Sequence, residues 1–181
     1  MIGREYSNQV DYDSLQVQGG SGFMKDYPIE RIYRDARITT IYEGTTQLQV
    51  VAAIRGVTTG AFLNRIRQYE EIPVKAEHDY LKKMLVQLTG DYTTAVEEVT
   101  AKKDTEYLDF HARRLVEMAG HIIMGYLLLL DAQRSEDYAT SADIFIKRAV
   151  AENSSRYSYI MDFAEQDLGS YKSMLEEVLP E

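Results

Sequence analysis

One acidic residue stands where a general base could act on a ligand: Glu43, in the segment Ile41-Tyr42-Glu43-Gly44-Thr45. The segment comes just before a predicted helix, and a glycine follows the acid. A carboxylate that faces an apolar cleft binds its proton more tightly and can remove a proton from carbon, and glycine leaves room for a ligand and a free N–H. An exposed acid that complements the dipole of the next helix fits the same pattern. The segment alone therefore leaves both interpretations open.

Three glycines form the second candidate for chemistry. Gly19, Gly20 and Gly22 follow Gln16 closely. Because glycine has no side chain, backbone N–H groups beside it can approach a phosphate. The pattern is not the dinucleotide-binding fingerprint, since no strand precedes it and no long helix follows it directly. The plainer interpretation is that these glycines end a helix and open a loop.

The three histidines do not form a recognisable catalytic or metal-binding pattern. A di-iron bundle needs Glu-x-x-His pairs, and no glutamate lies three residues before His78, His111 or His121. Glu117 could pair with His121 across one turn of a helix. We expect structural or surface roles for the histidines and no metal site. The chain has no cysteine, which excludes disulfides, thiol nucleophiles and thiolate metal sites.

Four segments taken together resemble the end of the catalytic domain of acyl-CoA dehydrogenases. They are residues 16–23, 26–31, 34–36 and 41–49. Their order and spacing match the signature of that family over about 35 residues, within a resemblance that covers residues 1–68. Residues 73–181 are similar, more weakly, to an extra helical C-terminal region of some longer bacterial members.

This resemblance implies FAD-dependent α,β-dehydrogenation of an acyl-CoA thioester. In the family, the glutamate of the Tyr-Glu-Gly-Thr motif removes the α-proton while a β-hydride passes to the flavin. Glu43 stands at that position, and the backbone of Glu43 and Gly44 matches the contact to the thioester oxygen. Some relatives place the base on an earlier helix, whereas this chain is similar to the commoner arrangement.

The resemblance also implies which residues bind the cofactor. Gln16 and Gly20 match residues that lie near the FAD pyrophosphate of a neighbouring subunit, and Gly19 belongs to the same turn. Thr45 and Gln47 match positions that approach the FAD from the catalytic turn.

The implied substrate side is formed by Tyr42 and Gly44, which match residues that line the acyl-CoA. The implied partners are the acyl-CoA substrate, electron-transfer flavoprotein as electron acceptor, and further copies of the parent protein in a homo-oligomer. Arg31, Arg34 and Asp35 also match the signature, and we interpret them as a structural ion-pair cluster.

Family members contain further domains that hold most of the flavin and substrate pocket. The resemblance therefore implies that this chain is a C-terminal fragment, inactive alone and unable to retain FAD. In a rival interpretation, residues 73–181 form a non-catalytic interaction or dimerisation module attached to the end of a dehydrogenase domain.

Helical patterns predict the elements that must position the candidate residues. We expect helices over residues 4–18, 28–36 and 46–68, separated by a glycine loop and an extended or irregular segment at residues 37–42. Thr46 and Gln49 fit a capping box at the start of the third helix.

The rest of the sequence predicts a bundle. Apolar residues recur at helical spacing over residues 74–102, 104–134, 136–166 and 168–179. Short connections make consecutive helices antiparallel neighbours, so the expected fold is an all-α antiparallel bundle with short glycine-containing loops at its N-terminal end. We place the end of the dehydrogenase domain at residues 1–70 and the helical extension at 71–181. The apolar run at residues 122–130 predicts a central helix with Leu127 buried.

Charge limits the classes of partner. The formal net charge of the 181 residues is −9, with +1 in residues 1–67 and −10 in residues 68–181. This acidity argues against nucleic acid and anionic membrane surfaces. The run at residues 122–130 is about half the length of a bilayer span. We expect no membrane span and a cytoplasmic location.

Overall fold

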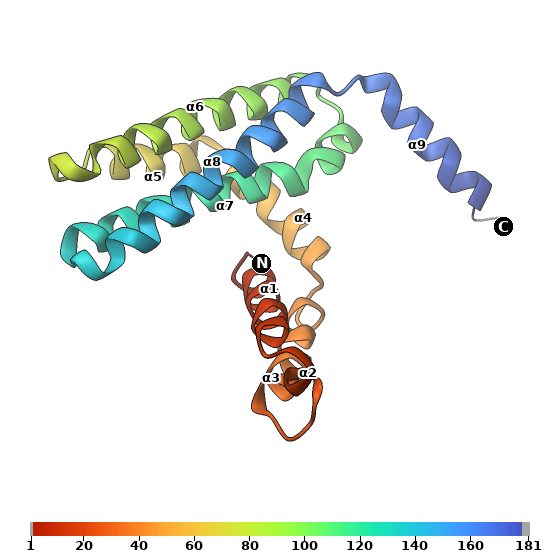
Figure 1. Ribbon diagram of the computed structural model, residues 1–181. Coiled ribbons are helices and arrows are strands. Elements are labelled where there is room, and N and C mark those ends of the chain that lie inside the picture. Colours follow the sequence, from red (N-terminus) through yellow and green to blue (C-terminus); the bar gives the residue numbers. More distant parts are fainter. Residues whose placement is uncertain (1, 179–181) are drawn as a thin grey trace. The chain divides into compact units, whose positions relative to one another are not determined.

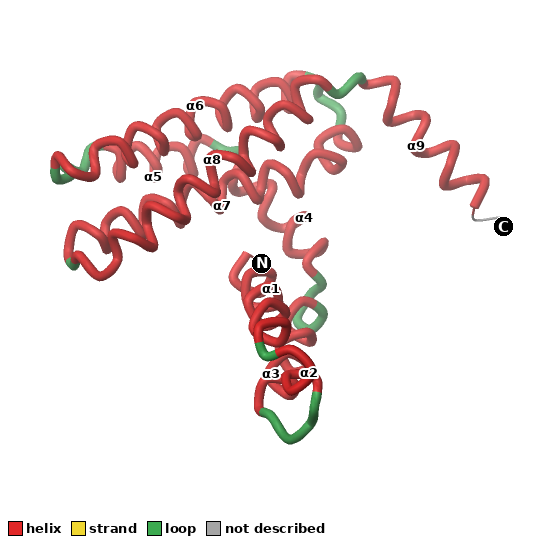
Figure 2. Tube along the Cα trace, viewed as in Figure 1, coloured by secondary structure: helices red, strands yellow, loops and turns green. Residues whose placement is uncertain are grey.

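The computed structural model describes residues 2–178, and every regular element within them is helical (Figures 1 and 2). The all-α bundle expected from the sequence is confirmed. The chain divides into two compact units, one up to Ala53 and one from Ile54 onward.

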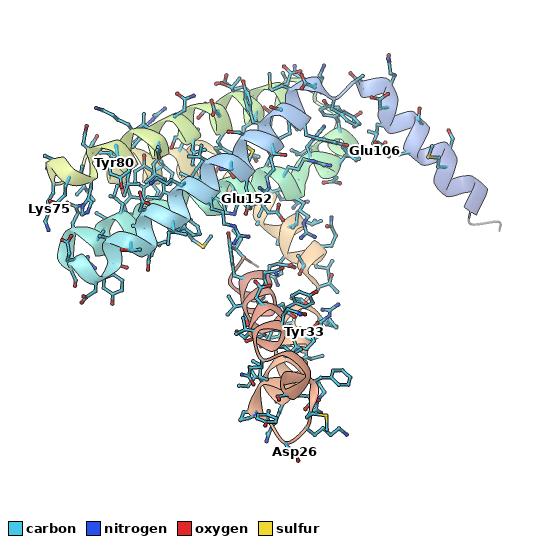
Figure 3. The ribbon with its side chains drawn as sticks, viewed as in Figure 1. Asp26, Tyr33, Lys75, Tyr80, Glu106 and Glu152 are labelled. Carbon is cyan, nitrogen blue, oxygen red and sulfur yellow. The ribbon has the colours of Figure 1, made fainter. Side chains whose placement is uncertain are left out.

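The first unit is built on two helices, α1 (Ile2–Val17) and α3 (Pro28–Arg37), which pack against each other. Proline at the first position of α3 loses no hydrogen bond, because that N–H has no partner inside the helix. Across the contact, Asn8 donates to the carbonyl of Ala36 at 3.1 Å. The ring of Tyr12 lies 6.4 Å from that of Tyr33, the residue labelled in Figure 3. These contacts fix α1 beside the segment that follows α3.

Two segments expected to be irregular are helical. The residues of the glycine cluster form a short helix, α2 (Gly19–Phe23), after Gly19 ends α1 with a left-handed φ of 58°. The segment after α3 continues as a 3₁₀ helix, η1 (Ile38–Thr40), and is not extended. The hydroxyl of Thr39 donates to the carbonyl of Ala36 at 2.7 Å, so a residue with strand propensity here extends the helix.

The helix expected over residues 46–68 is two helices, α4 (Thr46–Val57) and α5 (Gly60–Glu70). Thr58 and Thr59 interrupt it, because their hydroxyls donate to the carbonyls of Ile54 and Gly56, both at 2.7 Å. Such local hydrogen bonds compete with the helical pattern.

The second unit centres on three long helices that run back and forth along one another: α6 (Asp79–Ala101), α7 (Thr105–Arg134) and α8 (Ala139–Asp162) (Figure 1). Its other elements are α5, η2 (Ala76–His78), η3 (Glu136–Tyr138) and α9 (Glu165–Val178). Asp104 caps α7 by accepting hydrogen bonds from the backbone N–H groups of Glu106 and Tyr107. Leucine and isoleucine side chains from all three long helices fill the core.

The long helix α7 has more buried residues than α6 or α8, but it is not enclosed by them as the sequence predicts, because α6 and α8 also pack against each other. By length and composition, α7 could also cross a membrane. This is weak evidence for a membrane span, because the core helix of a bundle meets the same criteria, and 61% of the most apolar window of α7 is buried. The expectation that Leu127 is buried is wrong, since its side chain is 46% exposed. Tyr126 and Leu129 face the core instead, because α6 and α8 do not surround α7 completely.

The helix α5 packs with the second unit. Ile66 is fully buried, and Tyr69 stacks on Tyr126 with ring centroids 6.0 Å apart. The hydroxyl of Tyr92 donates to the carbonyl of Val57 at 2.5 Å. Packing thus divides the chain within α4, between Ala53 and Ile54. The domain boundary expected at residues 70 and 71 concerns the family's domain limits and stays a prediction.

Candidate functional site

The segment that carries Glu43 forms a tight turn between η1 and α4. The N–H groups of Ile41 and Tyr42 both bond to the carbonyl of Ile38, at 2.9 and 3.0 Å. Glu43 and Gly44 then adopt positive φ angles of 54° and 93°. A positive φ is uncommon for a residue with a side chain, and such conformations persist where the surrounding structure enforces them.

Two side chains from the start of α4 stabilise this turn. The hydroxyl of Thr45 accepts a hydrogen bond from the N–H of Leu48 at 3.4 Å, and the amide of Gln49 donates to the carbonyl of Glu43 at 3.0 Å. The capping box predicted for Thr46 is therefore wrong by one residue. Thr46 instead donates its hydroxyl to Glu5 of α1 at 2.5 Å, and Thr45 takes the capping position.

Arg4 of α1 reaches the same turn. One guanidinium nitrogen, Nη1, donates to the carbonyl of Tyr42 at 3.1 Å, and Nη2 lies 3.4 Å from Oε2 of Glu43. The guanidinium carbon also lies 5.1 Å from the centre of the Tyr42 ring. The sequence analysis missed Arg4, because nothing in the local pattern links residues that lie 38 and 39 positions apart.

The glycine cluster contains two kinds of glycine. Gly20 is exposed, and a Cβ added there would have no neighbour within 4 Å. Gly22 is buried, and a Cβ added there would lie 2.6 Å from the carbonyl oxygen of Leu15. The close approach of α2 to α1 thus requires Gly22, whereas the packing of this chain leaves Gly20 free for other contacts.

The structure brings the predicted site residues together in two groups. Tyr42, Glu43, Gly44, Thr45 and Gln47 lie in or beside the turn held by the first residues of α1. Gln16, Gly19 and Gly20 lie at the opposite, C-terminal end of α1. Gln16 lies twelve positions after Arg4, which corresponds to about 18 Å of helix at 1.5 Å per residue.

The three histidines are buried in the second unit. The ring of His78 lies 2.6 Å from the side-chain amide of Gln133. His121 contacts Asn153 at 2.8 Å and Glu152 of α8, labelled in Figure 3, at 3.6 Å. Glu117, the partner predicted for His121, forms ion pairs with Arg113 and Arg156 at 2.9 and 2.8 Å.

His111 has the most unusual environment of the three. It is fully buried among aromatic rings, and neither of its ring nitrogens has a hydrogen-bond partner. Burial, with a smaller contribution from the charge of Arg114, lowers the pKa of His111 to about 4. Within the part of the chain that the structure describes, no three histidine or acidic side chains gather as metal ligands would.

Family models match most of the chain. Residues 1–58 match the model described as "Acyl-CoA dehydrogenase, C-terminal domain", and residues 58–168 match "Acyl-CoA dehydrogenase C terminal".

Individual proteins agree with the family models. The broad-specificity linear acyl-CoA dehydrogenase FadE5 of Mycobacterium tuberculosis is 32% identical over 147 residues, which is 70% of this chain and 23% of that protein. Caffeyl-CoA reductase-Etf complex subunit CarC of Acetobacterium woodii is 49% identical over 45 residues, 25% of this chain and 12% of that protein. The chain thus spans less than a quarter of the length of either relative.

Two solved structures have a fold similar to that of this chain. An acyl-CoA dehydrogenase family protein from Porphyromonas gingivalis is 39% identical, with a TM-score of 0.59, over 62% of this chain and 98% of that one. An acyl-CoA dehydrogenase from Bacillus anthracis, crystallised with FAD, has a TM-score of 0.68 at 22% identity, over 96% of this chain and 34% of that one. At 22% identity, the structure from Bacillus anthracis supports a similarity of fold alone.

Proposed function

Because this chain belongs to the acyl-CoA dehydrogenase family, we propose that it supplies the proton-abstracting end of a flavin-dependent acyl-CoA dehydrogenase. The longer protein would convert an acyl-CoA thioester into the 2,3-unsaturated thioester. The observation that carries this proposal is the turn of Tyr42, Glu43 and Gly44, in which a carboxylate sits on a backbone of positive φ and is held from α1. Backbone conformations of this kind concentrate at functional sites.

In this proposal Glu43 removes the α-proton of the thioester. The backbone N–H groups of Glu43 and Gly44 would donate to the thioester oxygen, where negative charge develops as the proton leaves. Tyr42 and Gly44 would lie along the acyl-CoA. The Glu43 side chain is 72% exposed in this chain, so the water-excluding walls that a carbanion-forming step needs would come from the remainder of the longer protein.

FAD would accept the β-hydride of the substrate. The residues proposed to hold it fit its polar groups, because they are exposed neutral donors: the amides of Gln16 and Gln47, the hydroxyl of Thr45, and the backbone N–H groups at Gly19 and Gly20. The open space at the Cα of Gly20 would let a pyrophosphate approach the backbone.

We also propose that the parent is a homo-oligomer that passes electrons to electron-transfer flavoprotein. The distance of about 18 Å along α1 between the two groups of residues supports the first point, since Gln16 and Gly20 could then serve the flavin of a neighbouring subunit. The second point is supported by the relative whose name places it in an Etf complex.

The alternative is a non-catalytic helical module. It is favoured by the second unit, which has its own core and whose histidines are occupied in packing. The two proposals can both hold, with the first unit in catalysis and the second in an interaction between subunits.

The proposal is tested by comparing this chain with a longer protein that carries it. We expect the longer protein to show flavin absorbance and to release enoyl-CoA when saturated acyl-CoA thioesters of several chain lengths are supplied with an artificial electron acceptor. This chain alone should show neither property. A longer protein that binds FAD but forms no enoyl-CoA from any of the thioesters would contradict the proposal.

A further inference from the structure

We propose that Arg4 is a positioning residue for Glu43, an inference that rests on the proposed function of the turn. Arg4 holds the peptide carbonyl before the proposed base and the carboxylate of the base itself, through the two terminal nitrogens of one guanidinium group. The same group lies 5.1 Å from the centre of the Tyr42 ring. Three contacts from one side chain thus define the turn.

The geometry requires the fork of an arginine. Nη1 donates to Tyr42 at 3.1 Å while Nη2 lies 3.4 Å from the carboxylate of Glu43. A lysine would bring one positive nitrogen on a flexible stem, which cannot satisfy two acceptors in fixed directions in the same way. Stacking over an aromatic ring further fixes the plane of the guanidinium.

Arg4 can act as an anchor because it is better held than the residue it positions. Its side chain is 26% exposed, against 72% for Glu43. The next residue of α1, Glu5, accepts the hydroxyl of Thr46 at 2.5 Å. Consecutive residues of α1 therefore hold the turn on both sides of Gly44, and the otherwise exposed carboxylate keeps one direction.

Direction matters for a base that takes a proton from carbon. The reacting atoms must approach closely and in line, and a misplacement of about 1 Å can reduce the rate about a hundredfold. Loss of Arg4 should therefore slow the chemical step, while substrate affinity, which depends on remote parts of the thioester, changes little.

Nuclear magnetic resonance of this chain tests the contact without any enzymatic assay. In the wild-type chain, the Nη–H signals of Arg4 should be resolved and slowly exchanging, and Arg4→Gln should move the amide signals of residues 42–44. Arg4→Lys should restore them only in part. The matched control is Arg31→Gln, because Arg31 also lies 3.4 Å from a carboxylate but is 79% exposed, and its partner, Asp35, belongs to α3 and not to the turn.

A reciprocal variant guards against misfolding of the first variant. Glu43→Gln should leave the signals of α3 in place and speed the exchange of the Arg4 Nη2–H group, which loses its charged partner, while Nη1 still donates to the carbonyl of Tyr42. Turn signals in Arg4→Gln that superimpose on those of the wild-type chain, or Arg4 signals unaffected by Glu43→Gln, would overturn the proposal.

The catalytic consequence is measured in a longer protein that carries the chain. Arg4→Gln should lower kcat at least about tenfold with KM within about twofold and FAD still bound. An unchanged kcat overturns the positioning role. A wild-type longer protein without dehydrogenation overturns the proposed function instead, and the resonance measurements on this chain still decide whether Arg4 holds the turn.

Discussion

The two units differ in what they bury. Among the described residues, the first unit contributes three members of the buried apolar core, Ile29, Ala36 and Val50, and the second unit contributes all the others. Large apolar side chains are instead exposed along the first unit: Val10, Tyr12, Val17, Phe23, Met24, Tyr27, Ile32, Ile38, Ile41, Tyr42, Leu48 and Val51.

The difference separates chemistry from stability. The first unit carries the turn of Glu43 and the exposed glycines, but it buries fewer apolar side chains than the second and so has less to offset the entropy of ordering its chain. The second unit carries no proposed catalytic residue and has a continuous core across α6, α7 and α8. We infer that the first unit is the less stable of the two, whereas the second is a folding unit in its own right.

The largest effect should come from separating the units. Residues 54–181 should fold alone and melt cooperatively by circular dichroism, because their core is retained. Residues 1–53 alone should lose their helical signal at a lower temperature and over a wider range, because they bury fewer apolar side chains. A sharp melt of residues 1–53 would contradict the comparison.

Two leucines of α7, Leu127 and Leu129, lie two positions apart, and their truncation should show which side of α7 faces the core. Leu129→Ala should destabilise the chain by about 2–5 kcal/mol, since Leu129 is buried and its truncation leaves a cavity. Leu127→Ala, its exposed control, should cost less than about 1 kcal/mol. Urea unfolding measures both, and equal losses would mean that α7 is covered on its outer side as well.

Acid should weaken the second unit through His111. Its pKa is about 4 in the folded chain and about 6.5 in an unfolded one, so between these values the unfolded state binds more protons and stability falls as pH falls. The loss between pH 7 and pH 5 should be about 2 kcal/mol from this group. His111→Phe should flatten the dependence in that window. The urea midpoint is measured at pH 7 and pH 5 for the wild-type chain and for His111→Phe. A shift between the two pH values that is the same in both proteins would contradict this assignment.

The smallest effects distinguish the two kinds of glycine in the first unit. Gly22→Ala should move the amide signals of α1 and α2, because the added Cβ meets the backbone oxygen of Leu15 at 2.6 Å. Gly20→Ala should leave them in place, since nothing lies within 4 Å. If Gly20→Ala then weakens FAD binding in the longer protein, the loss cannot be attributed to packing within α1 and α2. If Gly20→Ala moved the amide signals of α1 and α2 as much as Gly22→Ala does, the proposed difference between the two glycines would be wrong.

Periodicity predicted the long helices well because their apolar faces lie against one another. The cap at Asp104 and both ends of α7 follow from local sequence, whereas α6 begins only at Asp79 and α8 ends already at Asp162, inside the expected ranges 74–102 and 136–166. Local patterns failed where threonine hydroxyls bonded to the preceding turn, as at Thr39 and Thr58, and where one residue decided the cap, as at Thr45. The exposure of Leu127 depends on how far its neighbours extend around α7, which periodicity does not specify.

The candidate site was predicted as a set of residues but not as an arrangement. The motif around Glu43 identified the turn, yet the positive φ of Glu43 and the approach of Arg4 arise from packing of α1 beside η1. The separation of Gln16 and Gly20 from the turn is likewise a consequence of the length of α1.

The central claim is that Glu43 is the base, and α-proton exchange tests it most directly. A longer protein that carries the chain is incubated in D₂O with a thioester, and deuterium at the α-carbon is followed by mass spectrometry. Glu43→Gln, which keeps the shape and loses the base, should slow exchange by about 10²–10⁴-fold with FAD still bound. Glu30→Gln, which removes the partner of Arg34 in α3, should exchange as the wild type does. Exchange in Glu43→Gln within about tenfold of the wild-type rate would contradict the assignment.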